Sequence, residues 1–151
     1  MPGSAEKPTL AIRIPPDGRH ARTVRDALLA FASLHGVNPS DQEAMLFAVG
    51  EALANAIEHG EPTTDINVLI EIDSQLISAR VADNGRGFGE VPSGHAPLPA
   101  TYAERGRGIP IMQRSVDLCD VQSIPGRGTI VTLGRFRRDA MPANQEHAVP
   151  T

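Results

Sequence analysis

Apolar residues recur along this chain with two different periods, and the order of these periods constrains the fold more than any other feature. Five segments have the pattern of strands, and they cover 9–14, 65–73, 76–81, 118–124 and 128–136. Three segments have the spacing of amphipathic helices, and they cover 19–35, 41–59 and 109–116. This order predicts an α+β fold, a two-layer sandwich in which three helices cover one face of a mostly antiparallel sheet.

The helix over 41–59 is the best-marked element of the chain. Ser40 and Glu43 have the spacing of a capping box at its start, and Gly60 follows its end. The residues expected to face the core form one apolar stripe, and they are Leu46, Val49, Leu53, Ala56 and Ile57.

Length and composition predict one domain with an aliphatic core. The chain has 151 residues, of which 40% are hydrophobic, 21% are charged and only 3% are aromatic. We expect residues 9–138 to form the folded domain, with a flexible leader over 1–8 and a disordered tail over 139–151.

The basic residues exclude several classes of phosphate-handling protein. Thirteen of the 14 basic residues are arginines, and the single lysine is Lys7 in the expected leader. P-loop proteins and eukaryotic-type protein kinases both place a lysine on the ATP phosphates, so neither class fits. A phosphate site in this chain has to use backbone amides, arginines and a metal ion.

The remaining charge and cysteine content indicate a cytoplasmic protein. The net charge of −4 gives no basic footprint for nucleic acid or for an acidic membrane surface. Cys119 is the only cysteine, which excludes an internal disulfide. The N-terminal residues form no apolar signal segment, and no apolar run is long enough to span a membrane.

The first candidate motif is a polar pair on the helix over 41–59. Glu51 and Asn55 lie one turn apart, so their side chains point the same way. Three small residues flank them, and they are Ala44, Ala48 and Ala52. A bulky ligand could therefore approach this face closely, although the pair alone is equally consistent with a solvated helix face.

Two glycine-rich segments follow. Asp83 ends a strand and is followed by Gly85 and Gly87, which either bring the backbone against a ligand or simply form a turn. The second segment opens the third helix, where free N–H groups and the helix dipole can hold phosphate, and it otherwise fits a flexible lid hinge. Its residues of interest are Arg105, Gly106, Arg107 and Gly108.

The three motifs follow one another on a helix, at the end of a strand and at the start of a helix. This combination indicates a fold family much more specifically than any single motif does. The chain resembles the Bergerat-type ATP-binding fold shared by histidine kinases, DNA gyrase, the Hsp90 chaperone and the mismatch-repair ATPases. Its segments 51–59, 83–88 and 106–112 are most similar to the small anti-sigma-factor serine kinases of bacterial stress and sporulation control. The resemblance covers residues 9–136 and implies a histidine-kinase-like ATPase domain.

The resemblance also implies roles for individual residues. Asn55 would hold Mg²⁺, Asp83 with help from Thr129 would bind the adenine amine, and Glu51 would be the general base. A single carboxamide suits Mg²⁺, which commonly takes few protein ligands together with phosphate oxygens and waters. The other implied nucleotide-binding positions are the glycines Gly85, Gly87, Gly106 and Gly108 and the lid arginines Arg105 and Arg107.

The implied protein is an ATP-dependent serine/threonine kinase and anti-sigma factor of a partner-switching system. It would phosphorylate a serine on a small STAS-type antagonist, bind a sigma factor and form a homodimer, with no nucleic-acid or membrane partner. Two alternatives stay open. One is an ATP-dependent module that sequesters its partner without relevant phosphotransfer, and the other is an ATPase that uses water as the acceptor.

Overall fold

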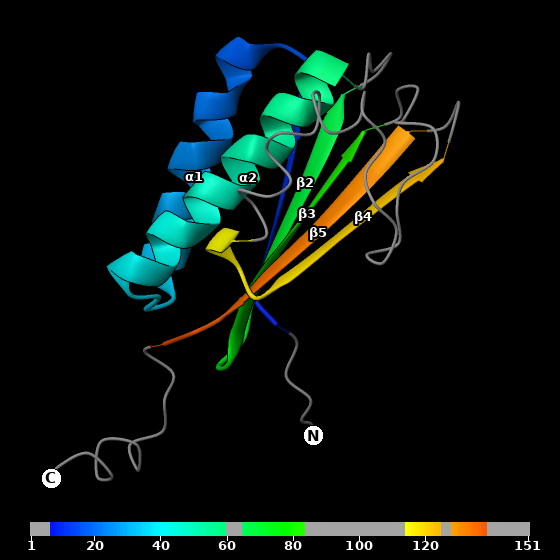
Figure 1. Ribbon diagram of the computed structural model, residues 1–151. Coiled ribbons are helices and arrows are strands. Elements are labelled where there is room, and N and C mark those ends of the chain that lie inside the picture. The colour runs from blue at the N-terminus through cyan, green and yellow to red at the C-terminus, as the bar shows by residue number, and fades with distance from the viewer. Residues whose placement is uncertain (1–6, 60–64, 84–113, 125–127, 139–151) are drawn as a thin grey trace, which may run out of the picture.

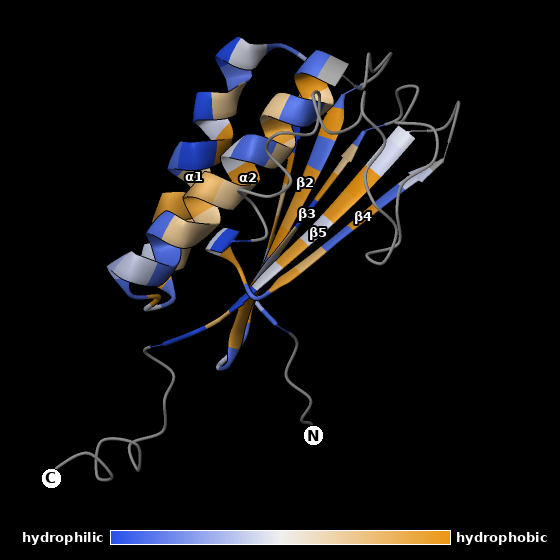
Figure 2. Cartoon of the chain, viewed as in Figure 1, coloured by the Kyte–Doolittle hydropathy of each residue, from blue (hydrophilic) through white to orange (hydrophobic). Residues whose placement is uncertain are grey.

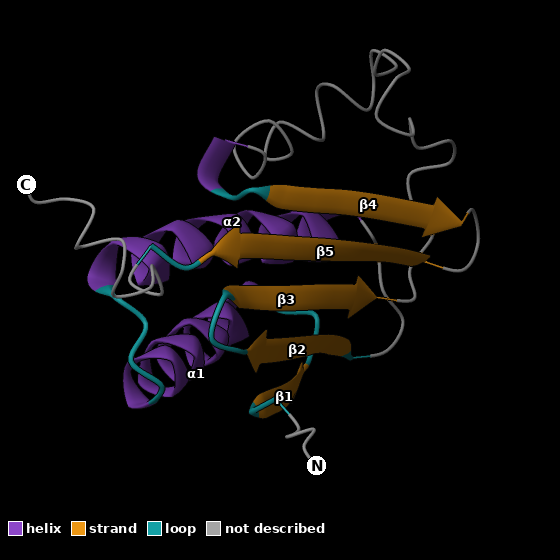
Figure 3. Cartoon of the chain, turned by 90° about the horizontal axis from the view of Figure 1, so that it is seen from below, coloured by secondary structure: helices purple, strands orange, loops and turns teal. Residues whose placement is uncertain are grey.

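Two layers form the structure, which is a computed structural model that describes residues 7–59, 65–83, 114–124 and 128–138. A five-stranded sheet carries two helices on one of its faces (Figures 1 and 3). The strands are β1 (Thr9–Ile14), β2 (Ile66–Ile72), β3 (Leu76–Asp83), β4 (Leu118–Ile124) and β5 (Gly128–Phe136). The helices are α1 (Ala21–Leu34) and α2 (Pro39–His59), and a short 3-10 helix (η1, Gly18–His20) precedes α1.

This architecture confirms the predicted α+β two-layer fold. The third predicted helix, over 109–116, lies mostly outside the described residues, and only its expected C-terminal part can be compared. Arg114 and Ser115 are helical there. No helix within the described ranges combines the length and apolar character needed to cross a membrane.

The sheet has the strand order β1-β2-β3-β5-β4, and every neighbouring pair is antiparallel. β3 and β5 are therefore hydrogen-bonded neighbours although β4 lies between them in the sequence. Their register places Asp83, the last residue of β3, directly opposite Thr129 near the start of β5. Residues paired in this way point to the same face of a sheet.

The core lies between the sheet and the two helices and is aliphatic, as predicted. Figure 2 shows apolar residues along the strands and along the sides of the helices that meet them. The fully buried side chains include Leu28 of α1, Met45 and Leu53 of α2, Ile70 of β2 and Leu133 of β5. Burial of such side chains contributes about 1.5–3 kcal/mol each, so this layer supplies most of the driving force for folding.

The buried face of α2 differs partly from the predicted stripe. Val49, Leu53 and Ala56 are buried as predicted, whereas Leu46 and Ile57 are only partly buried. Their places in the core are taken by Met45, Ala48, Ala52 and the polar Asn55. The alanines allow α2 to lie close to the sheet, so they are packing residues rather than an open surface beside the polar pair.

The start of α2 also differs from the prediction. The helix begins at Pro39, which tolerates the first helical position because that N–H needs no partner in the helix. The Oδ1 atom of Asn38 accepts a hydrogen bond from the backbone N–H of Asp41 at 2.7 Å. Asn38 is therefore the capping residue, and the predicted capping box of Ser40 and Glu43 is wrong because Ser40 already lies in the first turn.

Candidate functional site

The predicted nucleotide-binding residues that the structure describes lie at one end of the molecule. α2 ends, β3 ends and β5 begins at the top of Figure 1, and Figure 3 shows the same arrangement from below. Asp83, Thr129 and Asn55 belong to these three element ends. The fold thus brings together residues that are far apart in the sequence.

Asp83 and Thr129 lie opposite each other on neighbouring strands, and both polar side chains are buried. Asp83 continues the row of helix-facing residues of β3, and only 9% of its surface is exposed. Thr129 is 4% exposed, and its hydroxyl donates to Oγ of Ser123 on β4 at 3.3 Å. A carboxylate is costly to bury, so its place here has to be matched by polar contacts. Chemically, the pair combines an acceptor-only carboxylate with a hydroxyl, a set that suits recognition of an exocyclic amine.

Asn55 contributes the second polar group at this end. Its side chain is 7% exposed, and within the described residues its Nδ2 atom has no hydrogen-bond partner. A buried amide left without a partner costs about 1–3 kcal/mol, so a natural protein keeps one only for a reason. The carboxamide also carries an oxygen, which is a hard ligand of the kind that Mg²⁺ prefers. The Oδ1 atom of Asn55 therefore fits the predicted metal-binding role, whereas the Nδ2 donor can serve only an acceptor such as a phosphate oxygen.

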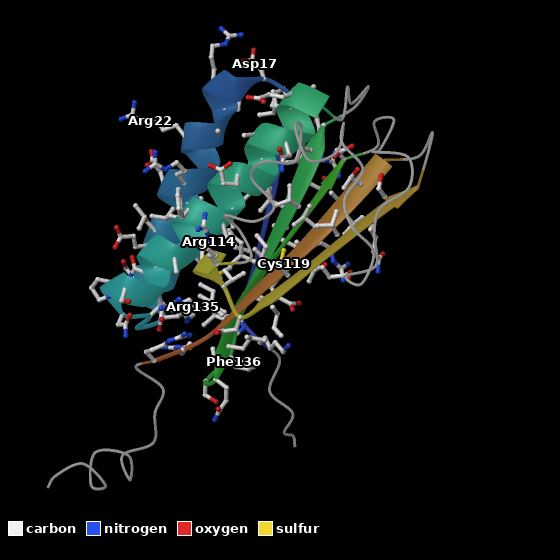
Figure 4. All side chains as sticks on the ribbon, viewed as in Figure 1. Asp17, Arg22, Arg114, Cys119, Arg135 and Phe136 are labelled. Carbon is white, nitrogen blue, oxygen red and sulfur yellow. The ribbon has the colours of Figure 1, made fainter. Side chains whose placement is uncertain are left out.

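Glu51 lies one helical turn before Asn55 and is more accessible. It is partly buried and lines a groove of about 800 Å³ beside α2. Phe47 of α2, Arg25 of α1 and the side chains of Arg114 and Arg135 line the same groove. Figure 4 shows Arg114 and Arg135 next to the N-terminal half of α2. A carboxylate at the edge of an open groove can accept a proton from a group that enters from outside.

Comparison with known proteins identifies the family. Residues 14–135 match the histidine kinase-like ATPase domain. The chain belongs to this family. It is 32% identical over 123 residues to the anti-sigma F factor of Thermoanaerobacter sp. (strain X514), an alignment that covers 77% of this chain and 82% of that protein. The anti-sigma F factor of Caldanaerobacter subterraneus subsp. tengcongensis shows the same identity and the same coverage.

A solved structure agrees with these matches to the ATPase family. The crystal structure of the RsbU and RsbW domains of Rv1364c from Mycobacterium tuberculosis superposes with a TM-score of 0.68 and 25% sequence identity. The match covers 89% of this chain and 34% of that one, so this chain spans about a third of its length. Together the matches confirm the predicted resemblance to anti-sigma-factor kinases of the histidine kinase-like ATPase fold.

Six predicted site residues of this ATPase domain lie in one stretch of the sequence, between β3 and β4. They lie outside the described residues and are the four glycines and the two lid arginines, namely Gly85, Gly87, Gly106, Gly108, Arg105 and Arg107. Their roles, like those of Glu51, Asn55, Asp83 and Thr129, stay predictions. Sequence reasoning missed two residues altogether, Asp41 and Arg135, which form a buried ion pair across 94 positions of the chain. No local pattern signals a pair so distant in sequence.

Proposed function

We propose that this chain is a Mg-ATP-dependent serine/threonine protein kinase and anti-sigma factor. It acts in the cytoplasm as a homodimer, phosphorylates a serine on a small STAS-type antagonist, and binds a sigma factor when the antagonist is phosphorylated. The relatives supply the partner class, because they carry the name anti-sigma F factor. The residues of this chain supply the chemistry.

One observation carries the proposal. The buried Asn55 amide, whose Nδ2 lacks a partner within the described part of the chain, lies one turn from Glu51, at the end of the fold where Asp83 and Thr129 pair. A metal ligand and a base beside a carboxylate that can position the nucleotide supply part of the positioning and charge neutralisation on which phosphoryl transfer depends.

Each residue has a defined task in the reaction. Asp83 accepts a hydrogen bond from the adenine amine and orients the nucleotide, with Thr129 beside it. The Oδ1 atom of Asn55 would hold Mg²⁺, which would supply charge neutralisation at the phosphates. Glu51 takes the proton of the acceptor serine hydroxyl. The serine oxygen forms a bond to the γ-phosphorus while the bond to the β,γ-bridging oxygen breaks, and ADP leaves.

The test begins with partner capture from the source cells, with and without ATP, followed by mapping of phosphoserine on the captured proteins. The captured acceptor is then incubated with the purified kinase and Mg-ATP. Glu51→Ala should keep its ATP affinity in calorimetry and lose phosphoserine formation, because it removes only the base. Asp83→Asn should lose ATP binding itself. Glu71→Ala is the matched control, because this glutamate lies on the sheet face that points away from the helices.

The other outcomes separate the alternatives. Partner binding that requires ATP but yields no phosphoserine above the Glu51→Ala background would support a sequestering module. Phosphate release that is unchanged by the partner would support an ATPase that uses water. Absence of any affinity for adenine nucleotides would refute the proposed function entirely.

A further inference from the structure

A buried ion pair joins the first turn of α2 to the end of β5. Nε of Arg135 lies 2.6 Å from Oδ1 of Asp41, and the two side chains are 14% and 0% exposed. The second carboxylate oxygen, Oδ2, accepts a hydrogen bond from the backbone N–H of Arg138 at 2.7 Å. Both oxygens of the fully buried Asp41 carboxylate thus accept hydrogen bonds from residues at and just after the C-terminal end of β5.

The same guanidinium reaches a third segment. Its NH1 group donates to the backbone carbonyl of Ser115 at 3.0 Å. Arg114 and Ser115 are the last helical residues before β4, and the final carbonyls of a helix have no partner within the helix. A guanidinium there supplies both a donor and a favourable charge for the negative helix end. Arg135 therefore holds three chain segments in one arrangement.

This arrangement shapes the groove that contains Glu51. Arg135, Arg114 and Ser115 line that groove together with Glu51. Asp41 and Glu51 lie on one helix, ten residues or about 15 Å apart along its axis. The guanidinium thus fixes the wall formed by Arg114 and Ser115 relative to the helix that carries the proposed base.

We propose that Arg135, held by Asp41, is a positioning residue for phosphotransfer that sets the distance between Glu51 and the wall at Arg114–Ser115. This inference rests on the proposed function. Stability alone does not account for the pair, because buried ion pairs are frequently no more stabilising than apolar residues of similar volume. A planar guanidinium that bonds two acceptors at fixed angles instead supplies orientation, which a point charge does not.

The experiment compares Arg135→Met and Arg135→Lys with Arg137→Met. Arg137 leaves the same end of the sheet and donates to two backbone carbonyls, those of Asp73 and His35, but it does not line the groove. Transfer to the captured acceptor is measured at saturating Mg-ATP, at a temperature where circular dichroism shows every variant folded. ATP affinity is measured separately by calorimetry.

We expect Arg135→Met to lower kcat at least tenfold. The Kd for Mg-ATP should stay within twofold, because Arg135 lies near the start of α2 and Asp83 lies near its other end. Arg135→Lys should recover thermal stability but less than half of the lost kcat, since an ammonium can pair with Asp41 without orienting the Ser115 carbonyl. Arg137→Met should lower the melting temperature and leave kcat within twofold. Amide hydrogen exchange over residues 114–118 should rise more in Arg135→Met than in Arg137→Met.

Two results overturn the inference in different ways. If wild type transfers phosphate and Arg135→Met keeps a kcat within twofold of Arg137→Met, the positioning role is wrong while the proposed kinase function stands. If wild type yields no phosphoserine above the Glu51→Ala background, the proposed function fails and the positioning role fails with it.

Discussion

Removing one partner of the Asp41–Arg135 pair should destabilise the protein more than removing both. Among the described residues, Arg135→Met leaves the fully buried Asp41 carboxylate with the Arg138 N–H as its one remaining hydrogen-bond partner. Breaking a buried pair in this way costs about 3 kcal/mol or more, and Asp41→Leu should cost about the same because it leaves the guanidinium buried. Within the part of the chain that the structure describes, the double variant loses two hydrogen bonds to backbone groups, at about 1 kcal/mol each.

The double variant should therefore lower the free energy of unfolding by about 2 kcal/mol, whereas the two single changes together should lower it by about 6 kcal/mol. The difference is a coupling energy of about 4 kcal/mol between the two side chains. Urea unfolding followed by far-ultraviolet circular dichroism measures it, because the chain has no tryptophan for fluorescence. A single change should also lower Tm by about 10 °C. A double variant that costs as much as the sum of the singles would refute the reasoning.

The pair between Asp117 and Arg138 is the matched control for this cycle. Its atoms approach to 2.8 Å, but the two side chains are 29% and 48% exposed. Water screens such a pair, so its coupling should not exceed about 1 kcal/mol. A control coupling as large as that of the buried pair would mean that burial is not the cause.

Three further predictions concern single side chains. Asn55→Leu should leave the urea midpoint unchanged or higher, because it removes a buried amide atom without a described partner. The same substitution should abolish the rise in Tm on adding Mg-ATP. A clearly lower urea midpoint would contradict the first expectation. Burial raises the pKa of Cys119 from 9.0 to about 11. Iodoacetamide at pH 8 should therefore modify the native thiol about 100-fold more slowly than the urea-unfolded thiol. Equal rates of modification would contradict this prediction. The hydrogen bond from Arg138 holds the pKa of Asp117 below its ordinary 3.8. The resulting difference in urea midpoint between wild type and Asp117→Asn should therefore be complete above about pH 4, shrink as pH falls below that value, and vanish only below the folded pKa.

The strands were the most predictable part of the fold. The alternation of apolar and polar residues placed β4 and β5 at the boundaries that the structure shows, and β1 likewise. Helix α2 was predicted at the correct place but with a partly wrong inner face. Periodicity weights large apolar residues such as Leu46 and Ile57, whereas close packing on the sheet selects Ala48 and Ala52.

The candidate site was predictable only where its residues share an element. Glu51 and Asn55 follow from helical spacing, but the pairing of Asp83 with Thr129 depends on strand order, for which the motif resemblance was needed. Asp41 has the sequence context of an ordinary acidic residue in a first helical turn. Its burial depends on an arginine 94 positions later, and such a contact exists only once the sheet is assembled.

The neighbouring positions of β3 and β5 have a practical consequence for protein engineering. The ladder that aligns Asp83 with Thr129 is formed entirely by those two strands, so its alignment does not depend on the length of chain that joins them. Each doubling of a connecting loop adds only about 0.6 kcal/mol of closure entropy. A fluorescent reporter inserted between β3 and β4, away from the predicted glycines and lid arginines, should therefore leave the alignment of Asp83 with Thr129 intact and could turn the proposed nucleotide binding into an optical signal.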